Sequence, residues 1–211
     1  MTFTSLQSDV RAYLERGSIT DETVYEQLPA LINMAERRLS REVKITGTIA
    51  VVNSTMVAGQ SVYAKPDRWR ETVSIAVGKG TDYNTFEIVN PRAYEFIREV
   101  WPDPTQTAVP RYYADYNYSN WLFAPTPALP HPYEIIYYEI PALLDDTNQT
   151  NWWTEYAPNA LLYATLLETT AFLKSDARLP VWEGFYNRAI AALNGEDVRQ
   201  IVDRTIVRRE D

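Results

Sequence analysis

The hydrophobic pattern of the chain changes its period twice, and this switch limits the possible folds more than any other feature. Apolar residues recur at helical spacing as far as Lys44, follow β-branched and alternating runs to about residue 149, and return to helical spacing from Asn151. Strands that are segregated from helices in this way indicate an α+β protein. We therefore predict a discontinuous α-helical bundle domain, residues 1–43 and 150–198, with an inserted, mainly antiparallel β domain, residues 44–149, that forms a small sandwich or barrel.

The N-terminal part of the sequence predicts helices. Thr4 and Gln7 have the spacing of a capping box at the start of the first one. Pro29 interrupts the second, and we expect it to kink that helix. The apolar positions of the second helix fall on one stripe, which comprises Val24, Leu28, Leu31, Ile32, Ala35, Leu39 and Val43.

The C-terminal part predicts two more helices. Pro158 suits the first turn of one, Ser175 and Asp176 suit the start of the other, and Gly195 is placed to break it. We expect the stripe that contains Leu162, Leu166 and Phe172 to pack on the stripe of the second helix, since both are too apolar to face water.

Between the helices, β-branched and aromatic residues predict several strands, separated by turn signals. The expected strands are residues 45–52, 61–64, 72–77, 86–89, 111–116, 121–124 and 133–140. One short helix is expected among them, with Asn90 as its N-cap and Pro91 at its first position.

The charge and residue usage argue against several classes of function. A net charge of -8 is unfavourable for a general nucleic-acid binder, which neutralises phosphates with Lys and Arg. Cysteine is absent, so no thiolate can act as a nucleophile or bind a metal. No apolar run approaches the ~20 residues that a membrane-spanning helix needs.

Few residues are candidates for catalysis or metal binding. His131 is the only histidine, lies between two prolines, and is expected to be an exposed turn residue. The run Gly78–Thr81 lacks the first glycine of a phosphate-binding loop, because position 73 is Val73. Residues 145–148 are expected to form a turn rather than a Ca²⁺ site. We predict a protein with no enzymatic activity, no cofactor and no metal, although an acid-base hydrolase that uses two of the 28 acidic residues stays as an alternative.

Aromatic residues are abundant, with fifteen tyrosines and six tryptophans. Such residues concentrate in cores and at interfaces. Trp152, Trp153 and the tyrosine-rich run 112–118 could also stack on sugars. A carbohydrate-binding module is therefore a second alternative function.

Several segments of the chain are informative through their order. They are residues 32–41, 63–69, 109–113, 122–127, 133–138, 141–144, 151–153 and 161–168, followed by Trp182, Tyr186 and Ala189. Taken in this order, they resemble the adaptor, or head-to-tail connector, family of short-tailed bacteriophages, of the tail tubular protein A type. The resemblance covers nearly the whole chain. Lys65 departs from it, because an apolar residue is expected near that position.

The resemblance implies a structural virion protein of the neck and tail, assembled in the host cytoplasm. It implies a ring of twelve copies that contacts the portal protein and the tail nozzle protein, with the tail fibre protein as a further candidate partner. Genomic DNA would pass through the lumen of this ring without sequence-specific binding. The resemblance implies no catalysis. If it holds, the carbohydrate-binding alternative would be a module of a phage tail.

The last residues, 199–211, are expected to form a C-terminal arm that is extended or weakly helical until it binds the portal. Apolar side chains next to arginines, whose guanidinium groups can donate two parallel hydrogen bonds to a carboxylate, suit a groove with acidic rims. The predicted portal-binding residues are Arg199, Ile201, Val202, Arg204, Ile206, Val207, Arg208 and Arg209.

Overall fold

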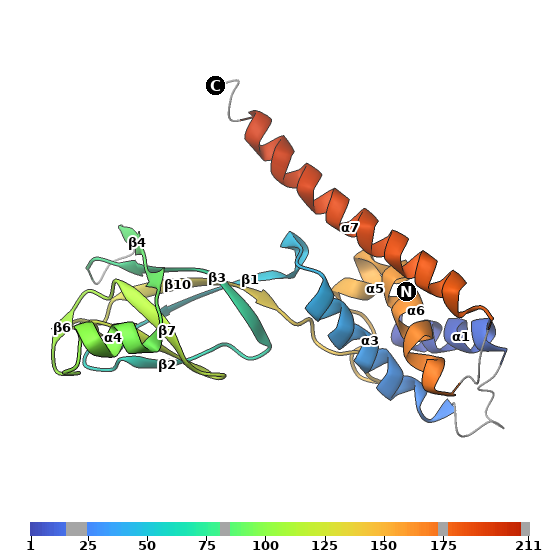
Figure 1. Ribbon diagram of the computed structural model, residues 1–211, viewed down its shortest axis with the longest axis horizontal. Coiled ribbons are helices and arrows are strands. Elements are labelled where there is room, and N and C mark those ends of the chain that lie inside the picture. Colours follow the sequence, from blue (N-terminus) through green and yellow to red (C-terminus); the bar gives the residue numbers. More distant parts are fainter. Residues whose placement is uncertain (16–24, 81–84, 173–176, 208–211) are drawn as a thin grey trace. The chain divides into compact units, whose positions relative to one another are not determined.

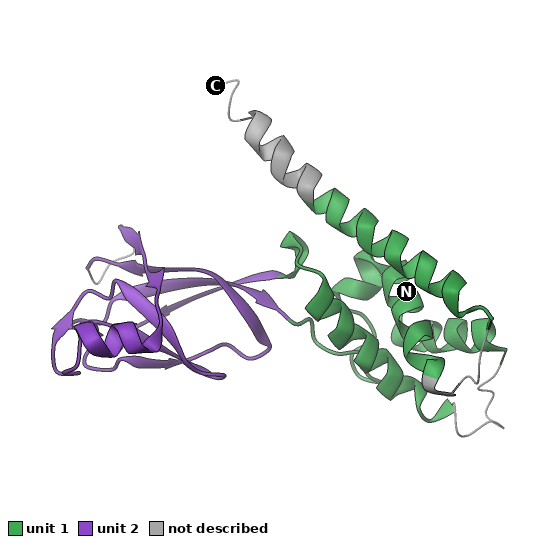
Figure 2. Ribbon diagram, in the orientation of Figure 1, with its two compact units in different colours: residues 1–48, 140–211 green, residues 49–139 purple. Residues whose placement is uncertain are grey.

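The structure is a computed structural model that describes residues 1–15, 25–80, 85–172 and 177–207, without the side chains of residues 171–172 and 198–207. The chain divides into two compact units (Figures 1 and 2). Residues 1–48 and 140–211 form a helical unit, and residues 49–139 form a unit that contains the sheets. The fold class is α+β, as the sequence predicts.

The helical unit buries one hydrophobic core that is shared by all of its longer helices. Phe3, Leu6 and Val10 reach this core from the N-terminus, and Trp182 and Tyr186 reach it from the other end of the sequence. The helices are α1 (Phe3–Leu14), α3 (Leu28–Glu42), α5 (Trp152–Tyr156), α6 (Pro158–Glu168) and α7 (Leu179–Val207), with short 3-10 turns at Thr46–Thr48 and Thr169–Phe172.

The predicted packing of the second helix on the helix that follows Pro158 is confirmed. Leu28, Ala35 and Leu39 of α3 are buried in the same cluster as Leu162 and Leu166 of α6. The two helices are more than a hundred positions apart in the sequence. Their contact therefore joins the two halves of the helical unit, which the inserted strands separate along the chain. Phe172 ends a 3-10 turn and its side chain lies outside the described residues.

Two predicted features of the N-terminal helices are wrong. The cap of α1 is Thr2, whose Oγ1 accepts a hydrogen bond from Ser5 N at 3.1 Å, whereas Thr4 N donates to Gln149 Oε1. The earlier start lets Phe3 join the core. Pro29 does not kink α3 but stands in its first turn, where its missing amide hydrogen is no loss.

A polar cluster connects three helices beside the core. Arg38 of α3 contacts Glu42 over 2.8 Å and Glu168 of α6 over 3.4 Å. Its guanidinium also lies 4.9 Å from the ring centroid of Tyr186 on α7, whose hydroxyl donates to Glu42. Burial raises the pKa of Tyr186 well above its usual value, so the phenol keeps its proton and remains a donor.

The other unit contains two four-stranded sheets. The first has the order β1 (Ile49–Thr55), β10 (Pro132–Glu139), β3 (Trp69–Gly78), β4 (Phe86–Ile88), and every pair in it is antiparallel. The second has the order β2 (Val62–Ala64), β8 (Asn120–Ala124), β7 (Tyr112–Asn117), β5 (Asn90–Pro91), with only β5 parallel to its neighbour. β6 (Thr107–Ala108) and β9 (Thr126–Pro127) form a small parallel pair.

The two sheets share one core, which makes this unit a sandwich rather than a closed barrel. Ile75 and Ile135 of the first sheet lie in the same cluster as Tyr63 and Phe123 of the second. The ring of Tyr63 meets that of Tyr133 across the sheets, with centroids 5.9 Å apart. Ala76 beside Ile75, and Leu122 and Ala124 beside Phe123, are buried as well, so these strand segments are covered on both faces.

The expected cap at Asn90 is wrong. Asn90 and Pro91 form β5, which pairs with Tyr112 and Tyr113 of β7, and the helix α4 (Tyr94–Val100) starts only after Ala93. Pro91 lacks an amide hydrogen, which an edge strand tolerates as well as a helix start does. The sequence signal therefore fits both structures.

The sheet unit is narrower than the expected β domain, residues 44–149. Ile45 and Leu144 are buried in the core of the helical unit and not in the sandwich. The β-branched run after Lys44 thus begins as a connection packed on helices and becomes a strand only at Ile49.

Candidate interaction sites

The predicted C-terminal arm is the last part of α7. The backbone is helical through Val207, so Gly195 does not break the helix and residues 199–207 are not extended. The ordering of this segment on the portal stays a prediction. The first part of α7 is held by Trp182 and Tyr186, which are 4% and 3% exposed. A helix that is already nucleated extends easily, because each added residue gains a backbone hydrogen bond.

This helix carries most of the predicted portal-binding residues on one continuous backbone. The residues on α7 are Arg199, Ile201, Val202, Arg204, Ile206 and Val207. Arg208 and Arg209 lie outside the described residues.

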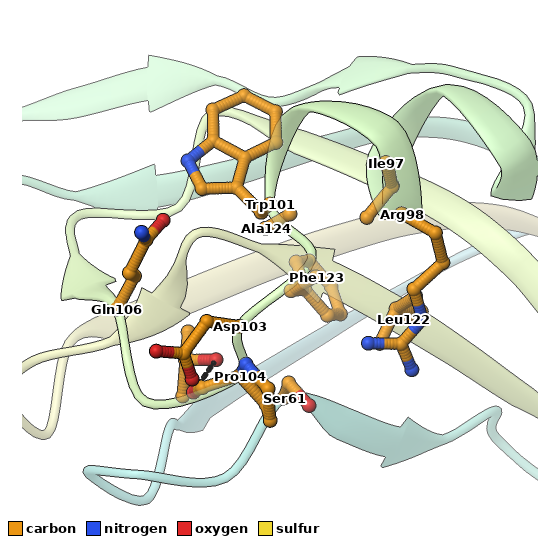
Figure 3. A pocket seen from close by; sticks show the side chains of 11 residues that line it. Ser61, Ile97, Arg98, Trp101, Asp103, Pro104, Gln106, Leu122, Phe123 and Ala124 are labelled. Carbon is orange, nitrogen blue, oxygen red and sulfur yellow. Dashed lines mark hydrogen bonds between the residues drawn. The ribbon is translucent and has the colours of Figure 1, made fainter.

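The sheet unit contains a small pocket between the end of α4 and β8 (Figure 3). It has room for about 10 Å³, which is enough for a single water molecule. Its carboxylate, Asp103, accepts hydrogen bonds from Thr105 N and Oγ1 at 2.8 and 2.7 Å, and these bonds hold its pKa below its usual range. This carboxylate stays ionised and shapes a turn, which does not favour the hydrolase alternative.

Among the described carboxyl groups with a shifted pKa, Glu36 is the one whose pKa is raised. Burial raises its pKa to about 7, against the opposing effects of hydrogen bonds from Leu144 N and Asn151. Its side chain is only 1% exposed, however, and lies in the helical unit beneath the segment that follows β10. Glu36 is therefore a structural group, out of reach of a substrate.

Residues 145–148 form the predicted turn. Asp145 Oδ1 accepts hydrogen bonds from Thr147 N, Thr147 Oγ1 and Asn148 N, each at 2.7 Å. These donors lower the pKa of Asp145. Oδ1 of Asp145 is thus occupied by hydrogen bonds within the turn.

His131 is buried, with 1% exposure, and the prediction of an exposed turn residue is wrong. Its carbonyl accepts a hydrogen bond from Met56 N at 2.8 Å, and its Nδ1 lies 3.1 Å from the carbonyl oxygen of Gly80. A carbonyl oxygen only accepts, so Nδ1 carries the proton in this contact. The two flanking prolines stiffen the loop, but the hydrogen bonds with Met56 and Gly80 hold His131 in the interior of the sheet unit.

The tyrosine-rich run forms part of a surface that we call the aromatic–arginine surface, made of Arg92, Tyr94, Phe96, Arg98, Tyr112 and Tyr116. These residues come from α4, β7 and the residue after β5 (Figure 1). Phe96 meets Tyr112 at 5.8 Å between centroids, and Tyr94 meets Tyr116 at 5.9 Å. Arg92 lies over the rings of Phe96 and Tyr112, and Arg98 over Tyr94. Exposed tyrosines stacked with arginines have the composition of binding hot spots in protein interfaces.

Comparison with protein families decides what kind of molecule presents these surfaces. The family described as SU10 adaptor protein matches residues 1–209. The chain belongs to this family. It is a bacteriophage adaptor protein, a structural component of the virion that interacts with other head and tail proteins. Among curated proteins, none is similar to it in sequence.

In this adaptor protein, the helices of the described ranges lack the combination of length and apolar character that a membrane crossing requires. The family match extends over both compact units and α7. The α7 helix is therefore part of the adaptor architecture.

The two tryptophans that suggested sugar stacking have different environments in the adaptor. Trp153 is fully buried in the helical core. Trp152 is half-buried and meets Tyr156, which is 67% exposed. Of these three rings, those of Trp152 and Tyr156 are placed to contact another molecule.

Lys65 departs from the pattern of the family resemblance. Where an apolar side chain would make an apolar contact, its ammonium group stacks on an aromatic ring. Its side chain is 3% exposed, and Nζ lies 3.6 Å from the ring centroid of Trp69 and 2.6 Å from Asp115 Oδ1. The long aliphatic stem fills apolar space while the ammonium group keeps a carboxylate partner. A lysine therefore fits where an apolar residue was expected.

Proposed function

We propose that this adaptor protein forms the ring that joins the portal to the tail of a short-tailed phage, as the tail tubular protein A type does. The observation that carries the proposal is the family match over residues 1–209. Twelve copies would continue the DNA channel from the portal and hand it to the tail nozzle protein. The ring would retain packaged DNA and pass it during ejection.

The net charge of the chain supports a channel role. At -8, the subunit as a whole repels phosphate, and DNA can slide along a wall to which it does not adhere. The DNA would make no sequence-specific contact.

The end of α7 is the part that we propose binds the portal. On a helix, residues four positions apart share a face, so Val202 and Ile206 provide one apolar pair in this segment. Arg204, Arg208 and Arg209 add guanidinium groups to the same short stretch of sequence. Apolar anchors combined with arginines suit an acidic groove on another protein.

Sedimentation of the adaptor, alone and mixed with the portal protein of the same phage, tests this function. We expect a ring, formed either alone or only on the portal ring, and we expect a chain truncated after Val198 to lose portal binding with an unchanged melting temperature. Full portal binding by the truncated chain would eliminate the role of the C-terminal segment. An adaptor that stays monomeric with the portal and binds glycans would instead favour the carbohydrate-binding alternative.

The aromatic–arginine surface is the competing contact site, and a variant of it tests the assignment of portal binding to α7. Tyr116 is 45% exposed and belongs to the sheet unit. A Tyr116→Ala variant should bind the portal like the wild type if the contact is made by α7.

A further inference from the structure

The helical unit contains an open hollow that none of the proposed contacts uses. It lies between the 3-10 turn Thr46–Thr48, the helix α5 and the middle of α7, and has room for about 350 Å³. Its lining residues are Ile45, Thr46, Gly47, Trp152, Tyr156, Leu193, Glu196 and Asp197.

Two aromatic rings form one wall of the hollow. Trp152 and Tyr156 lie on successive turns of α5, with centroids 5.4 Å apart and planes tilted by 30°. Gly47 lies flat against the indole, since a Cβ at this position would come within 2.4 Å of Trp152 Nε1. The absence of a side chain at Gly47 therefore lets the turn clamp Trp152 in place.

Two carboxylates of α7 lie beside these rings. Asp197 Oδ1 accepts hydrogen bonds from Thr46 N at 2.8 Å and from Thr46 Oγ1 at 2.7 Å, which fixes the carboxylate at the rim. Glu196 is exposed, and within the described part of the chain it forms no ion pair. Among the residues whose side chains the structure describes, no lysine or arginine lines the hollow.

This combination selects a cation with a flat face. Aromatic faces attract cations through the quadrupole of the ring, and a guanidinium both stacks on such a face and donates to carboxylates as a planar fork. An anion would be repelled by Glu196 and Asp197, and a neutral group would leave these carboxylates without a counter-charge. We propose that the hollow is a binding site for the guanidinium group of an arginine side chain of a partner protein.

The choice of a protein partner, rather than a free cation, rests on the proposed adaptor function. Charge complementarity supports it, because a subunit with a net charge of -8 offers its neighbours an acidic, aromatic recess. An exposed ring such as Tyr156 is also a common anchor at protein interfaces.

The test uses the peptide acetyl-Ala-Arg-Ala-amide as the probe and follows the indole NH signal of Trp152 by NMR, assigned with a Trp152→Phe variant. We expect saturable shifts. Glu196→Gln should weaken binding about two- to five-fold, because one exposed carboxylate is lost. Tyr156→Ala should weaken it by a similar factor, because one face of the cation site is lost.

Matched controls exist on the same protein. Glu183→Gln changes an exposed carboxylate on α7 away from the hollow, and Tyr118→Ala removes an 80% exposed ring from the sheet unit. Both variants should bind the probe like the wild type.

Three outcomes would overturn the proposal. They are the absence of saturable shifts, equal binding of the neutral citrulline analogue of the peptide, or agmatine binding several-fold more tightly than the peptide, which would identify a free cation as the occupant. Ring formation on the portal is measured separately by sedimentation. A failure of the probe with an intact ring therefore overturns the arginine site alone, and a missing ring with normal probe binding overturns the adaptor function alone.

Discussion

Glu36 of α3 and Leu144, 108 positions later in the sequence, are joined by a hydrogen bond in which the Leu144 amide donates to Glu36 Oε2 over 3.1 Å. The amide group of Asn151 donates to Oε1 of the same carboxylate. The segment between β10 and α5 is thus fastened to α3 by one buried acid. Its protonation should affect the stability of the helical unit.

We expect Glu36 to make the protein more stable at low pH than at neutral pH. Its pKa is about 7 in the folded chain, above the ordinary value of 4.5, so the folded state holds the proton more tightly than the unfolded chain. This stabilisation is complete below pH 4.5 and is lost as the pH rises through 7. A Glu36→Gln variant lacks this titration. Its unfolding free energy relative to the wild type should therefore rise by about 1–3 kcal/mol between pH 5 and pH 8, measured by urea unfolding.

The exposed Glu155→Gln variant on α5 is the control, and it should follow the wild type over the same pH range. Parallel pH profiles of the wild type and Glu36→Gln would contradict the raised pKa.

The stacked ammonium of Lys65 should contribute more to stability than its ion pair does. Lys65→Ala removes the buried stem and the cation over Trp69, and should lower the unfolding free energy by about 2 kcal/mol. Asp115→Asn removes only the charge of a partner whose side chain is 68% exposed, and should cost less than about 1 kcal/mol. Chemical denaturation measures both, and an equal or larger loss for Asp115→Asn would reverse the ranking.

Two glycines should respond to alanine with opposite signs. Gly47→Ala places a methyl group against Trp152, where it would meet the indole at 2.4–2.7 Å, and should destabilise by about 1–3 kcal/mol. Gly195→Ala meets nothing within 4 Å and lies inside α7, so it should stabilise by about 0.5–1 kcal/mol. Melting curves of the two variants provide the comparison. A tolerated Gly47→Ala would show that the indole moves easily.

The interface between α3 and α6 should show graded losses. Leu166 is fully buried and Leu162 is 9% exposed, so Leu166→Ala should cost about 3–5 kcal/mol and Leu162→Ala closer to 2 kcal/mol. Urea unfolding measures the two losses. A loss below about 0.5 kcal/mol at either position would mean that the two helices do not pack as described.

The elements that could be predicted from the sequence are those whose apolar pattern is long. The stripe of α3 follows from spacing, because burial on one face imposes a period on the sequence. The strand around Ile75 follows from its run of β-branched residues. Lys65 departs from the family resemblance, and its stacking on Trp69 depends on the turn between them, in which Trp69 N donates to the carbonyl oxygen of Pro66.

The features that the sequence did not reveal depend on contacts between distant residues. The burial of His131 is set by Met56 and Gly80, and the position of the α1 cap is set by the core contact of Phe3. The hollow beside Trp152 combines three separate segments, of which only the paired tryptophans carried a local signal. Helicity beyond Gly195 depends on how firmly the start of α7 is anchored.

The first and last strands of the sandwich unit, β1 and β10, are hydrogen-bonded neighbours, with Ile49 opposite Tyr138. The unit therefore begins and ends at adjacent points, and a short linker from Thr48 to Ile140 could replace it without rethreading the helical core. We therefore expect the sandwich to behave in evolution as an exchangeable insert. Phages could exchange or reshape it while keeping the helical half, and so change one set of contacts without rebuilding the other.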